Sequence, residues 1–326
     1  MKNIVIIGGG TGTFTLLEGL RRYPSNNSVI ASTADDGGSG GQLRYELAII
    51  PPGDYRQCLI GLAYTDEVYK KLFAYRFDTG SLAGHTAGNI ILAALAKVTG
   101  DPEKALEAAG KLLNVRGAVL PVTLKPTTLS AILENGKKIT GEHNIDEPKG
   151  NSRSKIKDLR LSPSGPVNPK VLQVIRSADV IIFGPGDLFT SIIPSLLVKG
   201  VREAINKSSA KKILVTNIMT KFGQTDGFKA SDFVVTLERF LRGAIDVALV
   251  NNKKPNMDIL KMYAKEKSKF VATDTKILSK TKVEIVTGDF LSEKVIKKTN
   301  GDRLKRSLVR HDSDKLAKMI YGLSNK

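Results

Sequence analysis

A glycine-rich turn follows directly on an apolar run at the start of the chain. Residues 3–7 read Asn-Ile-Val-Ile-Ile, and residues 8–13 read Gly-Gly-Gly-Thr-Gly-Thr. Glycines let the backbone approach a ligand, and the N–H groups at the start of the next helix attract an anion. The alternative is a tight turn that binds nothing. We predict a phosphate site made by Gly8, Gly9, Gly10, Thr11, Gly12 and Thr13.

Carboxylates follow the second strand-like run, residues 28–33. Asp35 and Asp36 stand before the glycine loop 37–41, where an acidic residue can bind a ribose or, through Mg²⁺, a diphosphate. Asp54 precedes the expected helix 55–63, so it could act as an N-cap with Gln57 or join Asp36 at a metal. We predict Asp35 at the nucleotide and Mg²⁺ on Asp36 and Asp54, which are catalytic only if the protein is an enzyme. The alternative is that both aspartates in the loop are turn formers.

Further polar candidates lie in later loops. A second glycine turn, residues 184–191, follows a buried run and resembles the first turn in form. Arg56 could clamp a phosphate or be a surface cation, and His85 could donate to a phosphoryl oxygen, act in acid–base chemistry, or be structural. Asn217 could read a base or sugar by paired hydrogen bonds. The remaining predicted ligand contacts are Asn89, Gly184, Gly186, Asp187, Thr190 and Ser191.

The composition limits the class of protein. The 326 residues are 41% hydrophobic and 25% charged, which is typical of a soluble globular protein. The apolar runs are too short to span a membrane, and the single cysteine, Cys58, suits a reducing compartment, so we predict a cytoplasmic protein. With one cysteine and three histidines, a structural zinc site is not expected.

The net charge of +18 is unevenly distributed, because residues 253–326 hold 19 Lys/Arg and 9 Asp/Glu. A basic surface can attract nucleic acid. Aromatic residues are not interleaved with these lysines, so we favour a solvated basic face over a nucleic-acid partner. The role of this basic part and the oligomeric state, including a homo-oligomer, stay open.

Short apolar runs alternate with amphipathic stretches along the chain. Runs at 3–7, 28–33, 180–183, 212–215 and 247–250 read as buried strands, and Asp101-Pro102 and Asn168-Pro169 read as helix starts. This alternation predicts an α/β fold, a Rossmann-like, doubly wound, mainly parallel sheet with helices on both faces. Residues 117–161 read as a β-rich insertion, and 314–323 as a closing amphipathic helix. We interpret residues 1–326 as a single nucleotide-binding domain that includes the basic part 253–326.

Taken in order, the loops resemble those of the bacterial gluconeogenesis factors, within the superfamily of 2-phospho-L-lactate transferases (CofD-like proteins). The segments that carry the resemblance span nearly the whole chain: 8–12, 34–39, 51–54, 88–89, 115–117, 184–186 with 190–192, 216–220 and 310–312. The resemblance implies a Rossmann-like sheet with one nucleotide pocket at the strand ends. In the transferase branch, aspartates matching Asp36 and Asp54 are expected to hold Mg²⁺.

The resemblance to the gluconeogenesis-factor branch implies binding of a UDP-sugar such as UDP-N-acetylglucosamine. It also implies support of cell shape and cell-wall synthesis during gluconeogenic growth, with no redox cofactor. The alternative is a Mg²⁺-dependent transferase that moves a phosphorylated organic acid from a nucleotide diphosphate to an acceptor hydroxyl. An NAD-type dehydrogenase is disfavoured, because Thr13 stands where the dinucleotide fingerprint has Gly or Ala.

The chain departs from the family pattern at five positions. The family usually has Ser at Asp187, Ser at Gly40, Arg at Gln42, Gln at Lys221 and Glu at Gln224. The carboxylate of Asp187 in a phosphate turn would repel a diphosphate unless a metal or a lysine compensates. The changes at Gln42 and Gln224 leave the identity of the sugar open.

Overall fold

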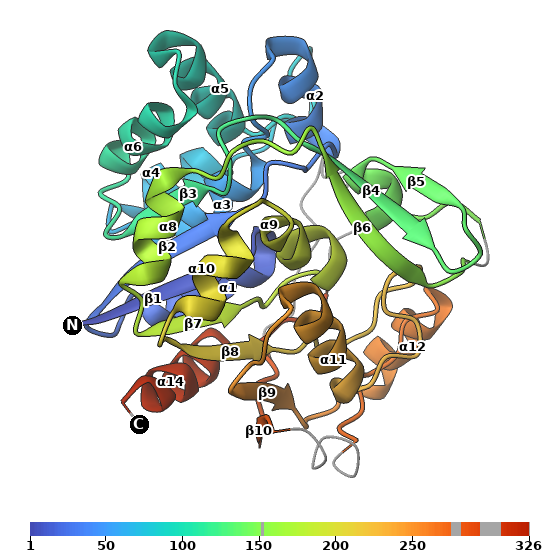
Figure 1. The fold of residues 1–326 in the computed structure, drawn as a ribbon. Coiled ribbons are helices and arrows are strands. Elements are labelled where there is room, and N and C mark those ends of the chain that lie inside the picture. Colours follow the sequence, from blue (N-terminus) through green and yellow to red (C-terminus); the bar gives the residue numbers. More distant parts are fainter. Residues whose placement is uncertain (151–152, 275–281, 294–307, 326) are drawn as a thin grey trace.

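A seven-stranded parallel sheet forms the centre of the molecule (Figure 1). The computed structural model describes residues 1–150, 153–274, 282–293 and 308–325. The strand order is β10-β9-β8-β7-β1-β2-β3. The bounds are β1 Lys2–Ile7, β2 Ser25–Ala31, β3 Ala118–Pro121, β7 Val180–Phe183, β8 Lys211–Val215, β9 Val247–Asn251 and β10 Glu284–Gly288.

Strand β1 lies between β2 and β7, and its side chains are buried on both faces of the sheet. Ile4 and Ile6 pack into one hydrophobic cluster, and Val5 and Ile7 pack into the other. Alternation along a strand sends neighbouring side chains to opposite faces, so a strand covered on both sides reads as one apolar run. The predicted doubly wound α/β fold is therefore confirmed.

Helices cover the two faces in separate groups. The cluster around Ile4 and Ile6 includes residues of α1 Gly10–Leu20, α3 Gly53–Gly61, α5 Ala87–Thr99, α6 Pro102–Leu112 and α14 Ser313–Ser324. The opposite cluster includes residues of α8 Pro169–Arg176, η1 Leu188–Ile192, α9 Ile193–Leu196, α10 Val201–Lys207 and α11 Ala230–Leu241. Phe73 of α4 Glu67–Ala74 also belongs to the first cluster, and Ile145 of α7 Glu142–Asp146 belongs to the second. The other helices of the described chain are α2 Gly38–Leu47 and α12 Met257–Lys265.

Local signals explain several helix starts. Asp101 caps α6 through the N–H groups of Glu103 and Lys104, and Asn168 caps α8 through the N–H of Lys170. In both helices a proline follows the cap, where its missing N–H costs nothing. The predicted closing helix is also confirmed, as α14.

The predicted β-rich insertion is present as a small antiparallel sheet of order β5-β4-β6, with α7 between its second and third strands in sequence. Its strands are β4 Thr128–Leu133, β5 Lys138–Thr140 and β6 Ile156–Ser162. The insertion starts later than predicted, because residues 118–121 pair parallel with β2 and belong to the main sheet. Parts of the basic region 253–326, namely 275–281, 294–307 and 326, lie outside the described residues.

Candidate functional site

The two glycine turns meet where the strand order reverses, between β1 and β7. A Cβ built on Gly12 would lie only 2.4 Å from the carbonyl oxygen of Pro185, so the turns are in direct contact. Gly10 and Gly184 have φ angles of +68° and +82°, which favour glycine. The carboxyl ends of the strands on either side of such a reversal form the crevice in which open α/β sheets bind ligands.

The threonines of the first turn are engaged inside the protein. Thr13 is completely buried, and its hydroxyl lies 3.5 Å from the carbonyl oxygen of Pro185 in the second turn. Thr11 is partly exposed and donates to Gln57 Oε1 at 3.2 Å. Thr13 therefore joins the two turns, and its contact with a phosphate stays a prediction.

Asp54 lies over the first glycine turn. A Cβ on Gly9 would come within 2.1 Å of Asp54 Oδ2, so only glycine allows this approach. Helix α3 begins at Gly53 with Pro52 as its N-cap, and no side chain caps it. The predicted capping role of Asp54 is wrong, because the helix starts two residues earlier than predicted and carries Asp54 in its first turn.

Asp35 and Asp36 point to different neighbours. Asp35 Oδ1 accepts from the N–H of Gly37 at 2.9 Å, and its Oδ2 is 3.4 Å from the Cβ position of both Gly40 and Gly53. Asp36 Oδ1 accepts from the N–H of His143 in α7 at 2.7 Å. Asp35 thus lies beside the start of α3, and Asp36 ties the loop after β2 to the antiparallel insertion.

The predicted magnesium pair, Asp36 and Asp54, therefore contacts two different elements. In the described part of the chain, no three or more His, Cys, Asp or Glu side chains are grouped to hold a metal ion. Mg²⁺ commonly takes only one or two protein carboxylates and completes its shell with phosphate oxygens and water. Asp36 and Asp54 would be its ligands here, and the metal stays a prediction.

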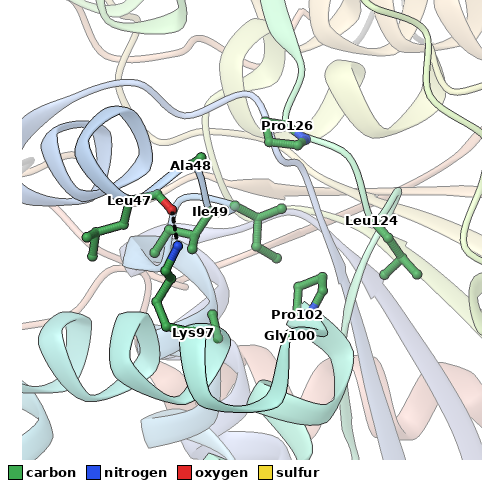
Figure 2. A pocket seen from close by; sticks show the side chains of 10 residues that line it. Leu47, Ala48, Ile49, Lys97, Gly100, Pro102, Leu124 and Pro126 are labelled. Carbon is green, nitrogen blue, oxygen red and sulfur yellow. Dashed lines mark hydrogen bonds between the residues drawn. The ribbon is translucent and has the colours of Figure 1, made fainter.

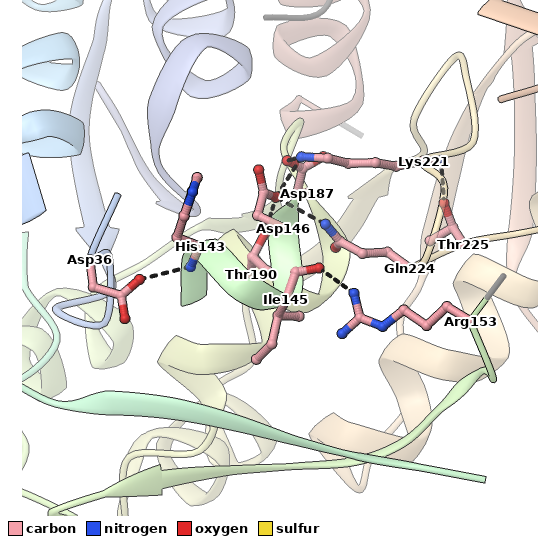
Figure 3. Close-up of polar contacts among 10 residues, drawn as sticks. All are labelled: Asp36, His143, Ile145, Asp146, Arg153, Asp187, Thr190, Lys221, Gln224 and Thr225. Atoms are coloured by element: carbon pink, nitrogen blue, oxygen red, sulfur yellow. Dashed lines mark hydrogen bonds and ion pairs between the residues drawn. The ribbon is translucent and has the colours of Figure 1, made fainter. Parts of the chain in front are cut away.

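A polar cluster around Asp146 connects three segments near the carboxyl ends of β7 and β8 (Figure 3). Lys221, from the loop after β8, lies 2.7 Å from Asp187 Oδ2 and also pairs with Asp146 Oδ1. Asp146 Oδ1 further accepts from Gln224 Nε2 at 2.9 Å and from Thr190 Oγ1 at 3.1 Å. We call Asp146, Asp187, Thr190, Lys221 and Gln224 the lysine cluster. It joins α7, the second glycine turn and the loop after β8.

The opposite charges of Asp146 and Lys221 stabilise each other, whereas burial raises the pKa of Asp187. Burial alone would raise the pKa of Asp146, but Lys221 and the hydrogen bonds from Gln224 and Thr190 outweigh it and lower that pKa. Burial would likewise lower the pKa of Lys221, yet Asp187 and Asp146 raise it above its ordinary value. Asp146 and Lys221 are therefore both charged at neutral pH.

Two other carboxyl groups of the site are hard to ionise. Burial, together with Asp36 and Asp146, raises the pKa of Asp35 to about 6, despite the N–H of Gly37. Burial and the nearby charges of Asp146 and Asp35 raise the pKa of Glu142 well above its usual range. A nearby cation stabilises the charged form of a carboxyl group whose pKa is raised by burial. We therefore expect a cation to bind favourably beside Asp35 and Glu142.

The candidates His85, Asn89 and Arg56 form one hydrogen-bonded chain with a residue that sequence reasoning missed, Ser39. Arg56 Nε donates to Asn89 Oδ1 at 2.9 Å, Asn89 Nδ2 donates to Ser39 Oγ at 3.1 Å, and Ser39 Oγ lies 3.0 Å from His85 Nδ1. Arg56 is 6% exposed, so the alternative prediction that it is a surface cation is wrong.

The candidates Ser191 and Asn217 lie in the segments that follow β7 and β8. Ser191 is partly exposed in η1, and its Cβ is 3.6 Å from the Cβ position of Gly186. Asn217 is partly exposed two residues after the end of β8. Sequence reasoning missed Asp146, because α7 is too short to show a helical period. It noted Lys221 and Gln224 only as departures from the family pattern.

A separate hollow lies away from these residues (Figure 2). It has a volume of about 220 Å³ and is lined by Leu47, Ala48, Ile49, Ile50, Ala96, Lys97, Gly100, Pro102, Leu124 and Pro126. Lys97 Nζ donates to the carbonyl oxygen of Leu47 at 3.3 Å across it. None of the predicted ligand contacts lines this hollow, so we place the candidate site at the carboxyl ends of the strands.

The fold and the two facing glycine turns define a Rossmann-like α/β protein with a candidate ligand crevice at the carboxyl ends of its strands. Comparison with known proteins narrows this class. The family model described as 2-phospho-L-lactate transferase CofD matches residues 4–291. The chain belongs to this CofD family.

Curated relatives and a solved structure match almost the whole chain. A Thermotoga maritima protein named "Putative gluconeogenesis factor" is 43% identical, with 98% of this chain and 99% of the relative aligned. The Bacillus subtilis gluconeogenesis factor is 39% identical, with 98% and 97% aligned. A crystal structure of a UPF0052 family member from Bacillus halodurans has a TM-score of 0.90 and 38% identity and covers 98% of both chains. The predicted resemblance is confirmed.

No helix among the described residues is long and apolar enough to cross a membrane.

Proposed function

We propose that the crevice between β1 and β7 binds a nucleotide diphosphate-sugar resembling UDP-N-acetylglucosamine. The observation that carries this proposal is the contact of the two glycine turns, with Gly12 against Pro185 at the reversal of strand order. Both turns lead into helical segments, whose first N–H groups favour phosphate. Asn217, which follows β8, would contact the uridine or the sugar.

The electrostatics of the site become compatible with a diphosphate when Lys221 and a bound cation are both present. The charge of Asp187 would repel phosphate, and Lys221, which lies 2.7 Å from it, is shared with Asp146 and offsets only one of the two carboxylates. Asp35, Asp36 and Asp54 leave negative charge near the first turn. Mg²⁺ on Asp36 and Asp54 would neutralise part of that charge and part of the charge of the diphosphate. We therefore expect Mg²⁺ to strengthen binding.

The relatives named gluconeogenesis factors suggest the cellular context. In this proposal the protein acts in the cytoplasm as a sensor of the nucleotide-sugar and supports cell shape and cell-wall synthesis when carbon comes from gluconeogenic sources. Such a role needs ligand binding without turnover.

A second candidate is a Mg²⁺-dependent transferase, favoured by the position of Asp54 over Gly9. The oxygen of an acceptor hydroxyl would bond to the phosphorus that carries the organic acid, and the bond from that phosphorus to the bridging oxygen would break. The nucleoside monophosphate would leave, and the hydroxyl proton would pass to it or to water. Asp36 and Asp54 would hold the metal, which supplies neutralisation of the leaving phosphate. Positioning by the glycine turns would supply much of the rate.

A thermal-shift titration against UDP-N-acetylglucosamine, GDP and NAD, each with and without Mg²⁺, tests both candidates. A ligand that binds the folded chain raises the melting temperature by mass action. A selective shift with the UDP-sugar, without product formation, is the expected result. A shift with GDP alone that requires Mg²⁺ and is lost in Asp54→Asn would favour the transferase. Selective tight binding of NAD would overturn both.

A further inference from the structure

The hydrogen-bonded chain Arg56–Asn89–Ser39–His85 has a fixed direction. The guanidinium of Arg56 can only donate, so the atom of Asn89 that it contacts is the carbonyl oxygen, Oδ1. The amide nitrogen of Asn89 must then face Ser39 and donate to its Oγ. We assign Ser39 Oγ as the donor to His85 Nδ1, because it already accepts from Asn89 and has its own proton left to donate.

This direction is opposite to that of a Ser-His-Asp triad. In a triad the serine donates to histidine, and histidine donates to a carboxylate, so the serine becomes a nucleophile. Here the chain starts at a cation and ends at the imidazole. In this assignment His85 Nδ1 accepts the hydroxyl proton, so Nε2 carries the ring proton. Ser39 is therefore a positioning residue, and His85 Nε2–H is the free donor of the chain.

The histidine is held rigidly. Its backbone N–H donates to the carbonyl oxygen of Leu82 at 2.9 Å, and its carbonyl oxygen accepts from the N–H of Phe77 at 2.9 Å. The residue is 8% exposed, so its ring still reaches solvent. No other described residue hydrogen-bonds its Nε2. A rigid donor that reaches solvent and has no partner in the described chain is suited to a ligand oxygen.

A series of contacts connects this donor with the glycine turns. Asp54 lies over Gly9, and Asp35 lies beside Gly53 and Gly40. Gly40 follows Ser39 in the first turn of α2. Asp54 and Asp35 thus belong to the series of contacts that leads from the first glycine turn to the helix that carries Ser39. These negative charges favour a neutral group over a second phosphate at His85.

We propose that His85 Nε2–H, oriented by Ser39, Asn89 and Arg56, donates a hydrogen bond to an oxygen of the sugar in a bound nucleotide diphosphate-sugar. This inference rests on the proposed function and assigns the sugar end of the ligand to the side of the crevice formed by α2 and α5. The glycine turns hold the diphosphate, and His85 distinguishes a sugar-bearing nucleotide from the nucleotide diphosphate alone.

Calorimetric titration of the full chain with UDP-N-acetylglucosamine and with UDP, both in Mg²⁺, tests the assignment. His85→Asn keeps a polar atom near the Nδ1 position for Ser39 and removes the donor at Nε2. We expect it to weaken UDP-N-acetylglucosamine binding about tenfold, as for the loss of one ligand hydrogen bond, and to leave UDP binding within about twofold. His85→Gln, whose amide nitrogen can reach the Nε2 position, should recover most of the loss.

A matched control and a ligand-free measurement complete the design. Val98→Ala, at a highly exposed position on α5, the helix that follows His85, should bind both ligands like the wild type. In the free protein, nitrogen NMR of the imidazole should show the Nε2–H tautomer for His85, and Ser39→Ala should change that spectrum.

Equal losses for UDP and the UDP-sugar in His85→Asn, or no loss for either, would overturn the assignment while the wild type still binds the sugar. An Nδ1–H tautomer for His85 would also overturn it. If the wild type binds neither ligand, the proposed function fails, and the sugar contact fails with it.

Discussion

The electrostatic roles of Asp187 and Lys221 depend on the residues that they contact in the folded chain. From the sequence, each is a departure from the family pattern, and Asp187 by itself suggests repulsion of phosphate. The structure places their charged atoms 2.7 Å apart, and Lys221 also binds Asp146. The two departures are therefore partners, although 34 positions separate them along the chain.

A double-mutant cycle measures this partnership. Lys221→Gln leaves Asp146 and Asp187 without their shared cation, so we expect a loss of about 1–3 kcal/mol in the free energy of unfolding. Side-chain exposures of 22–33% keep the loss below that of a fully buried pair. Asp187→Ser should cost less, and the double variant should be more stable than additivity predicts by about 1 kcal/mol. Urea unfolding gives all four values, and strict additivity would contradict the pairing.

Asp35 makes stability depend on pH with a definite sign. Its folded-state pKa of about 6 exceeds the ordinary 3.8, so folding favours the protonated form. The free energy of unfolding should fall as pH rises from about 4 to about 6, by at most about 3 kcal/mol. Asp35→Asn, which keeps an oxygen for the N–H of Gly37, should remove this fall and be more stable than the wild type at pH 8. Urea unfolding at pH 4 and pH 8 measures the effect, with Asp66→Asn, at an exposed position, as the control. If the stability of Asp35→Asn still fell with pH like that of the wild type, Asp35 would not be the source of the pH dependence.

Among the elements, the two glycine turns carry the candidate site because their backbones touch. A helix that begins in a glycine turn is readable from sequence, but the contact of two such turns depends on β1 and β7 lying side by side. Their register pairs Ile7 with Phe183, the last residues of both strands. This pairing brings Gly8 and Gly184 to the same level of the crevice.

Gly12→Ala should disturb that contact. Its Cβ would lie 2.4 Å from the Pro185 carbonyl oxygen, so the turns must move apart. We expect destabilisation of about 1–3 kcal/mol and at least a tenfold loss of nucleotide affinity, measured by urea unfolding and calorimetry. Gly322→Ala in α14, where a Cβ meets nothing within 4 Å, should be neutral or stabilising and bind normally. Wild-type affinity in Gly12→Ala would argue against the turns as the phosphate site.

In the molecule as a whole, the last helix supports the first. Helix α14 packs against α1, with Leu316 and Ile320 fully buried in the cluster that holds Leu16, Leu17 and Leu20 (Figure 1). Gly19 permits this approach, because a Cβ there would lie 2.1 Å from the Ser313 carbonyl oxygen. Helix α14 thus stabilises the position of α1, which begins in the first glycine turn.

Ile320→Ala should therefore destabilise the whole fold. The residue is fully buried, so we expect a loss of about 2–4 kcal/mol in the free energy of unfolding, compared with less than about 0.5 kcal/mol for the exposed Lys318→Ala. Ligand affinity of the folded variant should stay near the wild-type value, because Ile320 packs in the cluster that holds Leu16 and Leu20 and is not part of the glycine turn. A much smaller loss in the free energy of unfolding, measured with urea, would show that α14 packs weakly against α1.

The sequence by itself determined the alternating α/β architecture, the two glycine turns, and the capped starts of α6 and α8. These features depend on local properties, such as apolar periodicity, glycine and the Asp-Pro or Asn-Pro cap, which neighbouring residues reveal. The lysine cluster, the chain from Arg56 to His85, and the parallel pairing of 118–121 in the main sheet were decided only by tertiary structure. Each joins residues tens of positions apart, and hydrogen bonding and charge pairing act through space, which one sequence does not record.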